Sequence, residues 1–355
     1  MSPLLRVFLV LSTTLLSFWI LTSGKELIIP FVHAVFIWYL INVLSTAIMK
    51  LNIRGRTLPA SLRYLASALV IVAALATLFN FITQNVSQVI SVAPEYQARL
   101  QPLIDKALGW FPLEEPPSLR EFIAQFDLNT IISGLASSLA GIASNASIIA
   151  IYVIFLFLEQ RSFGPKIRGM TRGNTSTSSS EIFEIITEID QDIRTYIGIK
   201  TLTSAITGIV SFSIMAAIGL DFAAFWGVLI FFLNFIPTVG SILATIFPSL
   251  LSLLVFQSPL PIIGVVGGVT ATQVLVGNVL EPKLMGNTLN LSPLVILFSL
   301  SLWGALWGVT GMFLCVPITV ITMIVCSHFP QTRPFAVLLS ANGRVRGKRK
   351  PEEQR

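Results

Sequence analysis

The chain has 355 residues, of which 54% are hydrophobic and only 11% are charged. A soluble domain carries roughly 25% charged residues. The deficit is concentrated here, because residues 222–280 and 284–332 contain no Asp, Glu, Lys or Arg. Each run is long enough to cross a hydrocarbon layer of about 30 Å more than once. The composition therefore predicts an all-α, polytopic membrane protein, and it excludes a soluble enzyme, a nucleic-acid-binding domain and a secreted disulfide scaffold.

Apolar stretches along the chain predict about eight transmembrane segments. Six of them read as regular spans: Leu4–Thr22, Leu27–Met49, Tyr64–Ile82, Leu135–Leu158, Ile197–Leu220 and 259–277. A polar segment follows the third span, and its prolines, Pro94 and Pro102 among them, are expected to break it into short helices. Residues 181–196 carry apolar side chains at helical spacing, which predicts an amphipathic helix at the membrane surface that runs into the fifth span.

Two further apolar stretches, 222–256 and 291–326, are too long for one straight span of about 20 residues. The first is interrupted at Pro237 and Gly240, and the second at Gly308 and Gly311. Since each follows a regular span, we interpret them as broken, re-entrant hairpins within an inverted repeat of two units, 197–256 and 259–326. The alternative is that each stretch forms one long, kinked span.

Basic residues indicate the orientation, because they are retained in the cytoplasm. Loop 50–63, the start of loop 159–195 and the C-terminal tail are basic, whereas residues 84–134 carry a net negative charge. This alternation predicts that both termini are cytoplasmic. The expected parts are N-terminal spans 1–83, an extracytoplasmic polar helical segment 84–134, a span 135–158, a cytoplasmic loop with an amphipathic helix 159–196, a C-terminal transport core 197–332 and a basic cytoplasmic tail 333–355.

Polar residues are scarce in the apolar C-terminal half, and polar groups at membrane depth usually face protein or a water-filled cavity. They predict a substrate path, together with the glycines and proline that expose backbone beside them. The predicted path residues are Asn234, Pro237, Thr238, Gly240, Ser241, Gln273, Asn278, Gly308 and Gly311. The alternatives are structural: a kink without a ligand at 234–240, and close helix packing at the later glycines.

Glu281 and Lys283 are the only Asp, Glu, Lys or Arg residues in 222–332, and we predict that they gate or couple transport. The alternative is an interfacial anchor at the end of a span. His33 and His328 have no partner pattern, so we predict no metal site, and nothing indicates a cofactor or a catalytic triad. There is also no phosphate-binding loop, so transport is expected to run on a gradient, or else to take its energy from a separate partner.

Several ordered motifs make the chain resemble a known family. They are Phe235-Ile-Pro-Thr-Val-Gly240, Glu281-Pro-Lys-Leu-Met-Gly286, Leu291-Ser-Pro-Leu294, Trp303-Gly304 and the stretch Gly308–Pro317. In this order the sequence resembles the autoinducer-2 exporter family, also called the PerM-like permeases. The resemblance implies a multi-pass transporter of the bacterial cytoplasmic (inner) membrane that forms a homo-oligomer, with a pentamer expected. Family members are linked to export of the autoinducer-2 quorum signal, and some to sodium–proton exchange.

The chemistry of the core favours one of these activities. Autoinducer-2 is a small polyhydroxylated furanone, which suits amides and hydroxyls, whereas cation–proton exchange needs a carboxylate that releases its proton. We therefore expect a gradient-driven exporter of a small polar or amphipathic solute, not an enzyme. Its expected partners are that solute and membrane lipid, and no nucleic acid. The alternatives are a sodium/proton antiporter and a non-transporting membrane scaffold.

Overall fold

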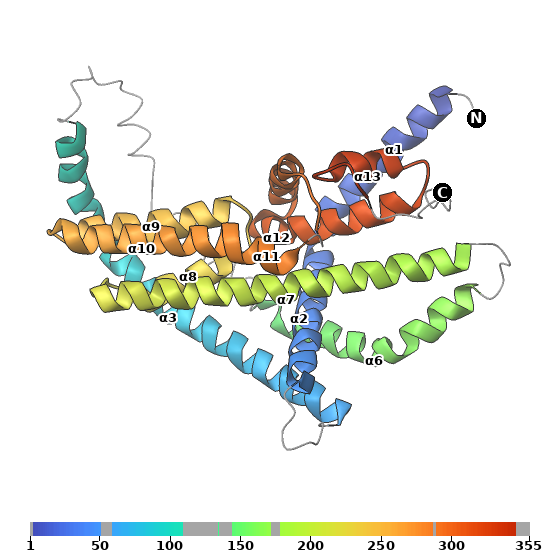
Figure 1. Cartoon of the computed structure of the whole chain (residues 1–355), viewed down its shortest axis with the longest axis horizontal. Helices are drawn as coiled ribbons and strands as arrows, with labels where there is room; N and C mark the ends of the chain where they lie inside the picture. The colour runs from blue at the N-terminus through green and yellow to red at the C-terminus, as the bar shows by residue number, and fades with distance from the viewer. Residues whose placement is uncertain are drawn as a thin grey trace, which may run out of the picture. The chain divides into compact units, whose positions relative to one another are not determined.

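The structure is a computed structural model that describes residues 3–50, 59–108, 134, 144–171, 178–286 and 289–345. These residues form helices joined by turns, and their β-pairing is one isolated bridge between Leu291 and Ser340 (Figure 1). Two compact units are present. The first comprises Met1–Ile71, Ser144–Lys200 and Leu284–Arg355, and the second comprises Val72–Ala143 and Thr201–Lys283. The predicted all-α class is confirmed.

The helices run in the order α1 (Pro3–Ser23), α2 (Lys25–Lys50), α3 (Ala60–Leu108), α6 (Ala146–Thr171), α7 (Ser178–Ile218), α8 (Ala223–Leu233), α9 (Val239–Val255), α10 (Pro259–Leu275), the π-helix η1 (Val276–Leu280), α11 (Glu281–Met285), α12 (Pro293–His328) and α13 (Arg333–Leu339). By length and composition, five helical stretches of the described chain could cross a membrane: Lys25–Met49, Ala60–Ile82, Ile182–Ile218, Pro259–Met285 and Pro293–His328. Several shorter apolar helices accompany them, which agrees with a polytopic helical protein.

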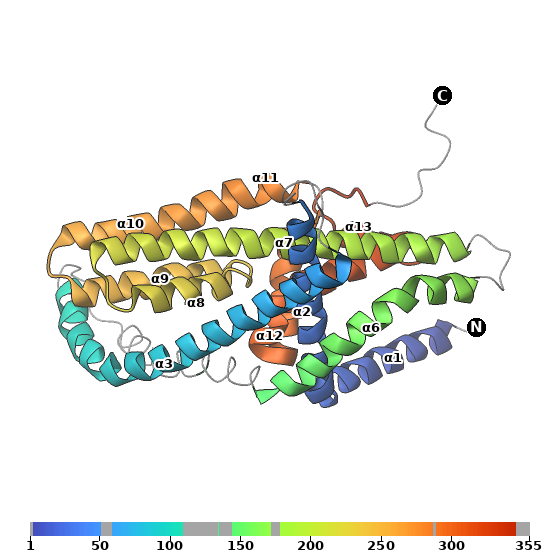
Figure 2. The same cartoon turned by 90° about the horizontal axis from the view of Figure 1, so that it is seen from below.

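One N-terminal prediction needs correction. Helix α3 continues past Ile82 to Leu108 with Pro94 and Pro102 inside it, so the prediction of short helices is wrong over this part. An internal proline removes one hydrogen bond and bends a helix, but the flanking turns keep their own bonds. Figure 2 shows that α3 bends towards its C-terminal end. Helix α6 continues to Thr171, past Leu158, and the end of the predicted span at Leu158 stays a prediction, because a helix can extend beyond the membrane.

Some sequence predictions concern residues outside the described chain. They fall in the predicted loop 50–63, in the polar segment 84–134, at the start of the predicted span 135–158, in the predicted cytoplasmic loop within 159–196 and in the basic tail. The corresponding undescribed residues are 51–58, 109–133, 135–143, 172–177 and 346–355. By contrast, α7 is one 41-residue helix, so the predicted amphipathic helix does run into the fifth predicted span.

In the first unit, α2 packs against α6, α1 and α12, and α12 also packs against α13. Aromatic side chains hold the α2–α12 contact, where the rings of Phe36 and Phe313 meet edge to face with centroids 4.9 Å apart. The indole Nε1 of Trp307 donates to the carbonyl oxygen of Leu21 at 2.9 Å, which ties α12 to the end of α1. A buried indole needs such a partner, so this bond fixes which face of α12 meets α1.

In the second unit, the C-terminal half of α7 lies beside α8 and α10, and α9 packs against both α8 and α10 (Figures 1 and 2). Glycines allow the close approach. A Cβ atom on Gly208 of α7 would lie 2.7 Å from the carbonyl oxygen of Gly227 on α8. A Cβ atom on Gly268 of α10 would lie 2.8 Å from the Ile214 side chain on α7. Small residues at such crossings let helices pack at van der Waals contact in a membrane.

The first broken stretch is a helical hairpin. Helix α8 ends at Leu233, α9 begins at Val239, and the two helices pack against each other. A Cβ atom on Gly240 would lie only 1.7 Å from the carbonyl oxygen of Leu233, so the second arm starts directly against the end of the first. The prediction of a hairpin here is confirmed, and the alternative of a single kinked span is wrong.

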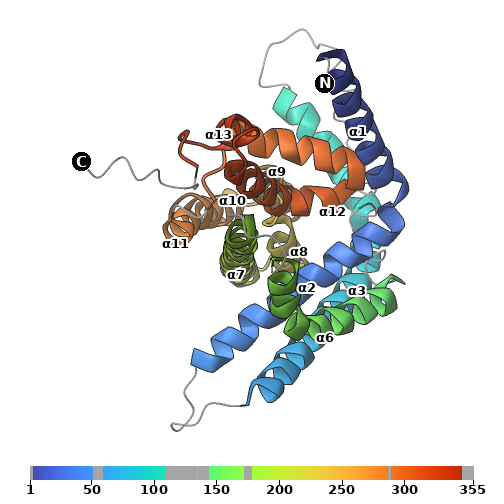
Figure 3. The same ribbon diagram turned by 90° about the vertical axis from the view of Figure 1, so that its right-hand side faces the viewer.

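The second broken stretch also doubles back, although its two arms are joined in one helix, α12. Gly308 has φ 60° and ψ −139°, a conformation that glycine adopts readily and that breaks the helix. The Ser299 hydroxyl lies 2.6 Å from that of Thr319 and donates to the Cys315 carbonyl at 3.1 Å. Twenty residues of straight helix would span about 30 Å, so the arms must lie side by side (Figure 3). The sidedness of both hairpins in the membrane stays a prediction.

Candidate functional site

The second unit contains a buried line of polar side chains. Four of them are hydroxyls of α7 with no exposed surface: Thr203, Ser204, Thr207 and Ser211. Three more come from the α8–α9 turn, from α10 and from the start of α11: Asn234, Gln273 and Glu281. We call these seven residues the polar seam. Hydrocarbon offers no hydrogen bonds, so such groups either bond to one another or serve a polar ligand.

At one level of the polar seam, Asn234 in the hairpin turn and the Glu281 carboxylate form hydrogen bonds with two neighbouring hydroxyls of α7. The Asn234 amide donates from Nδ2 to Ser204 Oγ at 3.1 Å. The Thr203 hydroxyl donates to Glu281 Oε2 at 3.4 Å. Because Thr203 and Ser204 are consecutive, α7 links the first hairpin to the residue that follows the π-helix. The structure thus brings two predicted site residues, Asn234 and Glu281, to adjacent positions.

At a second level, the polar seam holds unsatisfied groups. Ser211 Oγ and Gln273 Nε2 are buried and have no hydrogen-bond partner among the described residues. Ile214 of α7 contacts Gly268 of α10, whereas Thr203, which comes earlier on α7, contacts Glu281, which comes after α10. Helices α7 and α10 therefore run antiparallel, which places the turn of α7 with Ser211 level with the turn of α10 that carries Gln273. A buried polar group without a partner costs about 1–3 kcal/mol, so its presence needs an explanation.

The turn between α8 and α9 has a strained backbone. Thr238 has φ 58° and ψ −61°, which is unfavourable for a β-branched residue. Such strain is concentrated at ligand sites and switch regions. Of the predicted path residues in this turn, Asn234 and Gly240 are buried, Pro237 and Ser241 are half-buried and Thr238 is exposed. Only Asn234 reaches the polar seam.

Helix α10 ends in a π-helix, Val276–Leu280, immediately before Glu281. Short π-helical turns frequently mark functional sites, and this one had no signal in the sequence. Glu281 is half-buried, whereas Asn278 and Lys283 are exposed. Gln273 is buried, so the predicted path residues Gln273 and Asn278 differ in exposure, and their role in the path stays a prediction. Among Thr201–Lys283, the carboxylates are Asp221 and Glu281, so the polar seam contains one ionisable group.

The predicted path residues in the second hairpin, Gly308 and Gly311, belong to the first unit. A Cβ atom on Gly311 would lie 1.8 Å from the carbonyl oxygen of Trp303, which repeats the contact made by the glycine of the first hairpin. The rings of Trp303 and Trp307 touch each other, with centroids 5.0 Å apart. Close packing accounts for Gly311 and the two tryptophans, whereas Gly308 is explained by its positive φ, since a Cβ atom there would meet nothing within 4 Å. A role in the path stays a prediction for the two glycines.

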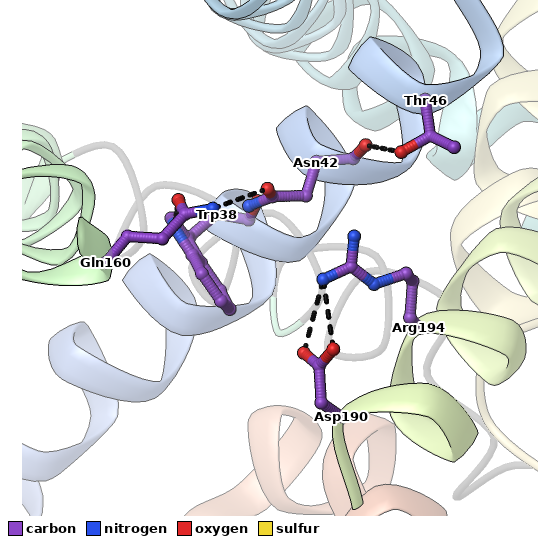
Figure 4. Close-up of polar contacts among 6 residues, drawn as sticks. All are labelled: Trp38, Asn42, Thr46, Gln160, Asp190 and Arg194. Atoms are coloured by element: carbon purple, nitrogen blue, oxygen red, sulfur yellow. Dashed lines mark hydrogen bonds and ion pairs between the residues drawn. The ribbon is translucent and has the colours of Figure 1, made fainter. Parts of the chain in front are cut away.

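A second, half-buried polar cluster lies in the first unit, where α2 meets α6 (Figure 4). Trp38 Nε1 donates to Gln160 Oε1 at 3.1 Å, Gln160 Nε2 donates to Asn42 Oδ1 at 3.3 Å, and Asn42 Nδ2 donates to the Trp38 carbonyl at 2.8 Å. Arg194 and Asp190, one turn apart on α7, form an ion pair at 3.1 Å. These groups satisfy one another, so the cluster ties helices together rather than offering free groups to a solute.

Comparison with known proteins decides the family. The sequence model described as AI-2E family transporter matches residues 8–331. The AI-2 transport protein TqsA of Escherichia coli K12 is 30% identical over 324 residues, covering 89% of this chain and 90% of that protein. A putative transport protein of Haemophilus influenzae is 31% identical over 325 residues, with 89% and 90% covered. One from Borreliella burgdorferi is 35% identical over 207 residues, 58% of this chain and 56% of that protein.

The chain belongs to the AI-2E transporter family. This confirms the resemblance found in the motifs. Together with the apolar helices, it makes the chain a multi-pass bacterial membrane protein of a transport family. The names of the relatives point to a transporter rather than an enzyme.

In this AI-2E family chain, sequence reasoning missed the hydroxyl side of the polar seam. Thr203, Ser204, Thr207 and Ser211 recur at helical spacing around Gly208, a pattern of small residues typical of close helix packing. That pattern was the available signal. The pattern predicts which face of α7 is buried, but only the fold shows which residues of the other helices that face contacts.

Proposed function

We propose that this chain exports a small, neutral polar or amphipathic solute across the bacterial cytoplasmic membrane, driven by a gradient, and that the solute binds at the polar seam. The observation that carries the proposal is the pair of buried groups, Ser211 Oγ and Gln273 Nε2, without a partner among the described residues. A solute with hydroxyl or carbonyl groups supplies the missing bonds. Autoinducer-2 is the first candidate, since a relative is named an AI-2 transport protein.

The test uses a pair of serines on the same helix. Ser211 is buried without a partner, whereas Ser213 is exposed and donates to its own helix at Ile209. Ser211→Ala removes no hydrogen bond within the described protein, so its free energy of unfolding should be unchanged or higher. If the hydroxyl binds solute, export should fall about five- to tenfold, as expected for the loss of one buried bond. Ser213→Ala should leave both quantities unchanged.

Export is measured with purified protein in liposomes against protein-free vesicles, with autoinducer-2 as the first solute. Asn234→Leu should also reduce export, because it removes the amide that bonds to Ser204. Normal export by both the Ser211 and the Asn234 variants would reject the polar seam as the solute site. The absence of solute movement by the unmodified protein would reject autoinducer-2 as the cargo.

Cation–proton antiport is the second candidate function, and Glu281 is the observation that favours it. This carboxylate is half-buried, accepts a bond from Thr203 and follows the π-helix directly. If it carries the exchanged proton, Glu281→Gln should abolish sodium-driven pH change in dye-loaded liposomes. Asp221→Asn, which removes the other carboxylate of Thr201–Lys283 at an exposed position, is the matched control. Sodium–proton exchange that persists in the Glu281 variant would exclude this carboxylate as the carrier.

The orientation and the assembly belong to the same proposal. Both termini face the cytoplasm, and the turn at Thr238 faces the outer side of the membrane. In a background in which Cys315 and Cys326 are replaced by alanine, Thr238→Cys should react with an impermeant maleimide added outside intact cells. Labelling only after the cytoplasm is opened would contradict this orientation. The homo-oligomer, expected to be a pentamer, is checked by the mass of the detergent-solubilised complex.

A further inference from the structure

A third buried donor lies beside the polar seam. Residues Thr201–Lys283, all of which the structure describes, contain four buried side-chain groups without a hydrogen-bond partner among the described residues: Thr201 Oγ1, Ser211 Oγ, Trp226 Nε1 and Gln273 Nε2. Ser211 and Gln273 belong to the polar seam, whereas Trp226 lies on α8 and is only 4% exposed. A buried indole N–H usually finds a partner, so the one on Trp226 needs an explanation.

The contacts between helices place Trp226 close to the two groups of the polar seam. A Cβ atom on Gly227 of α8 would lie 2.6 Å from the Phe212 side chain of α7. Trp226 and Ser211 therefore each directly precede a residue of the same contact. Gln273 lies level with this turn of α7, so at 1.5 Å per residue the three groups span about 6 Å along the helix axes. We call Ser211, Trp226 and Gln273 the donor trio.

The surroundings of the Trp226 ring are aromatic. The ring stacks on Phe247 of α9, with centroids 5.9 Å apart and planes at 25°. Phe225 meets it edge to face, with centroids 5.3 Å apart. These two contacts hold the indole in place, and neither ring offers an oxygen or nitrogen acceptor to its N–H group.

Within the donor trio, only the indole has a fixed hydrogen-bonding role. A hydroxyl can rotate and an amide can turn over, so Ser211 and Gln273 can each donate or accept, whereas an indole N–H only donates. A ligand must therefore present an acceptor to Trp226. Residues 201–280 contain no Lys or Arg, so no positive charge would compensate for a buried anion. The acceptor is therefore uncharged.

The aromatic surroundings also distinguish between uncharged acceptors. An alcohol oxygen can accept from Trp226 Nε1, but the hydrogen of that alcohol would then lie among Phe225 and Phe247 without a partner, which is unfavourable. A carbonyl oxygen accepts and carries no hydrogen. The position beside Trp226 therefore suits a carbonyl group, and the position beside Ser211 and Gln273 suits a hydroxyl group.

We propose that the donor trio binds a neutral hydroxyketone, whose carbonyl oxygen accepts from Trp226 Nε1 and whose hydroxyl group bonds to Ser211 and Gln273. This inference rests on the proposed function and specifies the chemistry of its solute. It adds Trp226 as a binding residue, so that the solute touches α7, α8 and α10 of the second unit.

The experiment records the indole N–H signals by NMR, using the full chain in nanodiscs with isotope-labelled tryptophan. Trp226→Phe identifies the Trp226 signal by its loss. The probe is acetoin, a neutral hydroxyketone, and the comparison is the butanediol formed by reducing its carbonyl group. Acetoin should move the Trp226 signal downfield in a saturable way, and the diol should bind at least about fivefold more weakly. The signals of Trp38 and Trp307 should not move, because these indoles already donate within the protein.

Variants of the other two residues test whether the donor trio acts on one solute. Ser211→Ala and Gln273→Leu should each weaken acetoin binding about five- to tenfold, as expected for the loss of one buried bond. Ser213→Ala, at an exposed serine of the same helix, should leave it unchanged. If the Trp226 variant does not fold, the Ser211 and Gln273 variants still decide, because the signal that acetoin moves should respond more weakly in both.

The results that overturn the inference are distinct from those that overturn the proposed function. An unmoved Trp226 signal, equal binding of acetoin and the diol, or tighter binding of the anion lactate would overturn the inference. Export of autoinducer-2 from liposomes by a protein with any of these results would leave the proposed function standing. Acetoin binding at Trp226 by a protein that moves no solute would support the donor trio as a binding site and reject export.

Discussion

Replacing Gly240 by alanine tests how closely the two arms of the first hairpin must pack. The added Cβ atom would lie 1.7 Å from the carbonyl oxygen of Leu233 and 2.7 Å from its carbonyl carbon. Real Cβ atoms essentially never approach another atom more closely than 3.0 Å, so the arms have to separate by at least about 1.3 Å. Both clashing atoms belong to the backbone, and no side chain can rotate away to relieve the overlap.

We expect Gly240→Ala to lower the free energy of unfolding by about 3 kcal/mol, the upper end of the usual cost of overpacking. The measurement is reversible unfolding in mixed detergent micelles. Gly267→Ala is the control, because a Cβ atom there meets nothing within 4 Å inside α10. An alanine at that position should stabilise the helix by up to about 1 kcal/mol. Equal stability of the two variants would show that the arms do not close at Gly240 and would refute the hairpin geometry.

Two further predictions concern the first unit. Trp307→Phe should lower the free energy of unfolding by about 1 kcal/mol, because it leaves the Leu21 carbonyl without its donor. Trp19→Phe is the control in the same unfolding assay. It should change the free energy of unfolding little, because the Trp19 side chain is 63% exposed. A double-mutant cycle with Ser299→Ala and Thr319→Ala should give a coupling energy of about 1 kcal/mol, because the two hydroxyls lie 2.6 Å apart. If the two substitutions changed the free energy of unfolding additively, the arms of α12 would not touch there.

The architecture could be predicted largely from where charges, glycines and prolines occur. Charge-free runs located the apolar core, and the interruptions at Gly240 and Gly308 located both hairpin turns. The same kind of reasoning was wrong at Pro94 and Pro102, where α3 continues. Proline costs a helix roughly one hydrogen bond, and in a long helix the remaining bonds outweigh that loss. A proline therefore marks a turn reliably only where glycine or polar residues accompany it.

The site was harder to predict, because hydrogen bonding between helices depends on their register. Asn234 was a candidate from its place in an apolar run, but its partner Ser204 lies 30 residues earlier, and the pattern of small residues that contains Ser204 does not indicate which residue it meets. The π-helix before Glu281 was likewise invisible, since the residues of Val276–Leu280 fit an ordinary helix. Asn278 was a candidate from its polarity. Its side chain is exposed, and its role in the path stays a prediction.

The two hairpins close by the same contact but differ in the polar groups they carry. In each, a glycine begins the second arm against a carbonyl oxygen of the first, Leu233 for Gly240 and Trp303 for Gly311. This likeness supports the interpretation of a duplicated unit at the level of local geometry. The hydroxyls between the arms of α12 bond to each other, whereas the amide at the tip of the first hairpin bonds outward to α7. A movement of the first hairpin away from α7 must therefore break or exchange a bond in the polar seam, whereas the second hairpin is bonded outward by the Trp307 indole to the Leu21 carbonyl. Solute binding in the polar seam would replace the first of these bonds, which is the physical reason to expect transport chemistry at the first hairpin rather than at both.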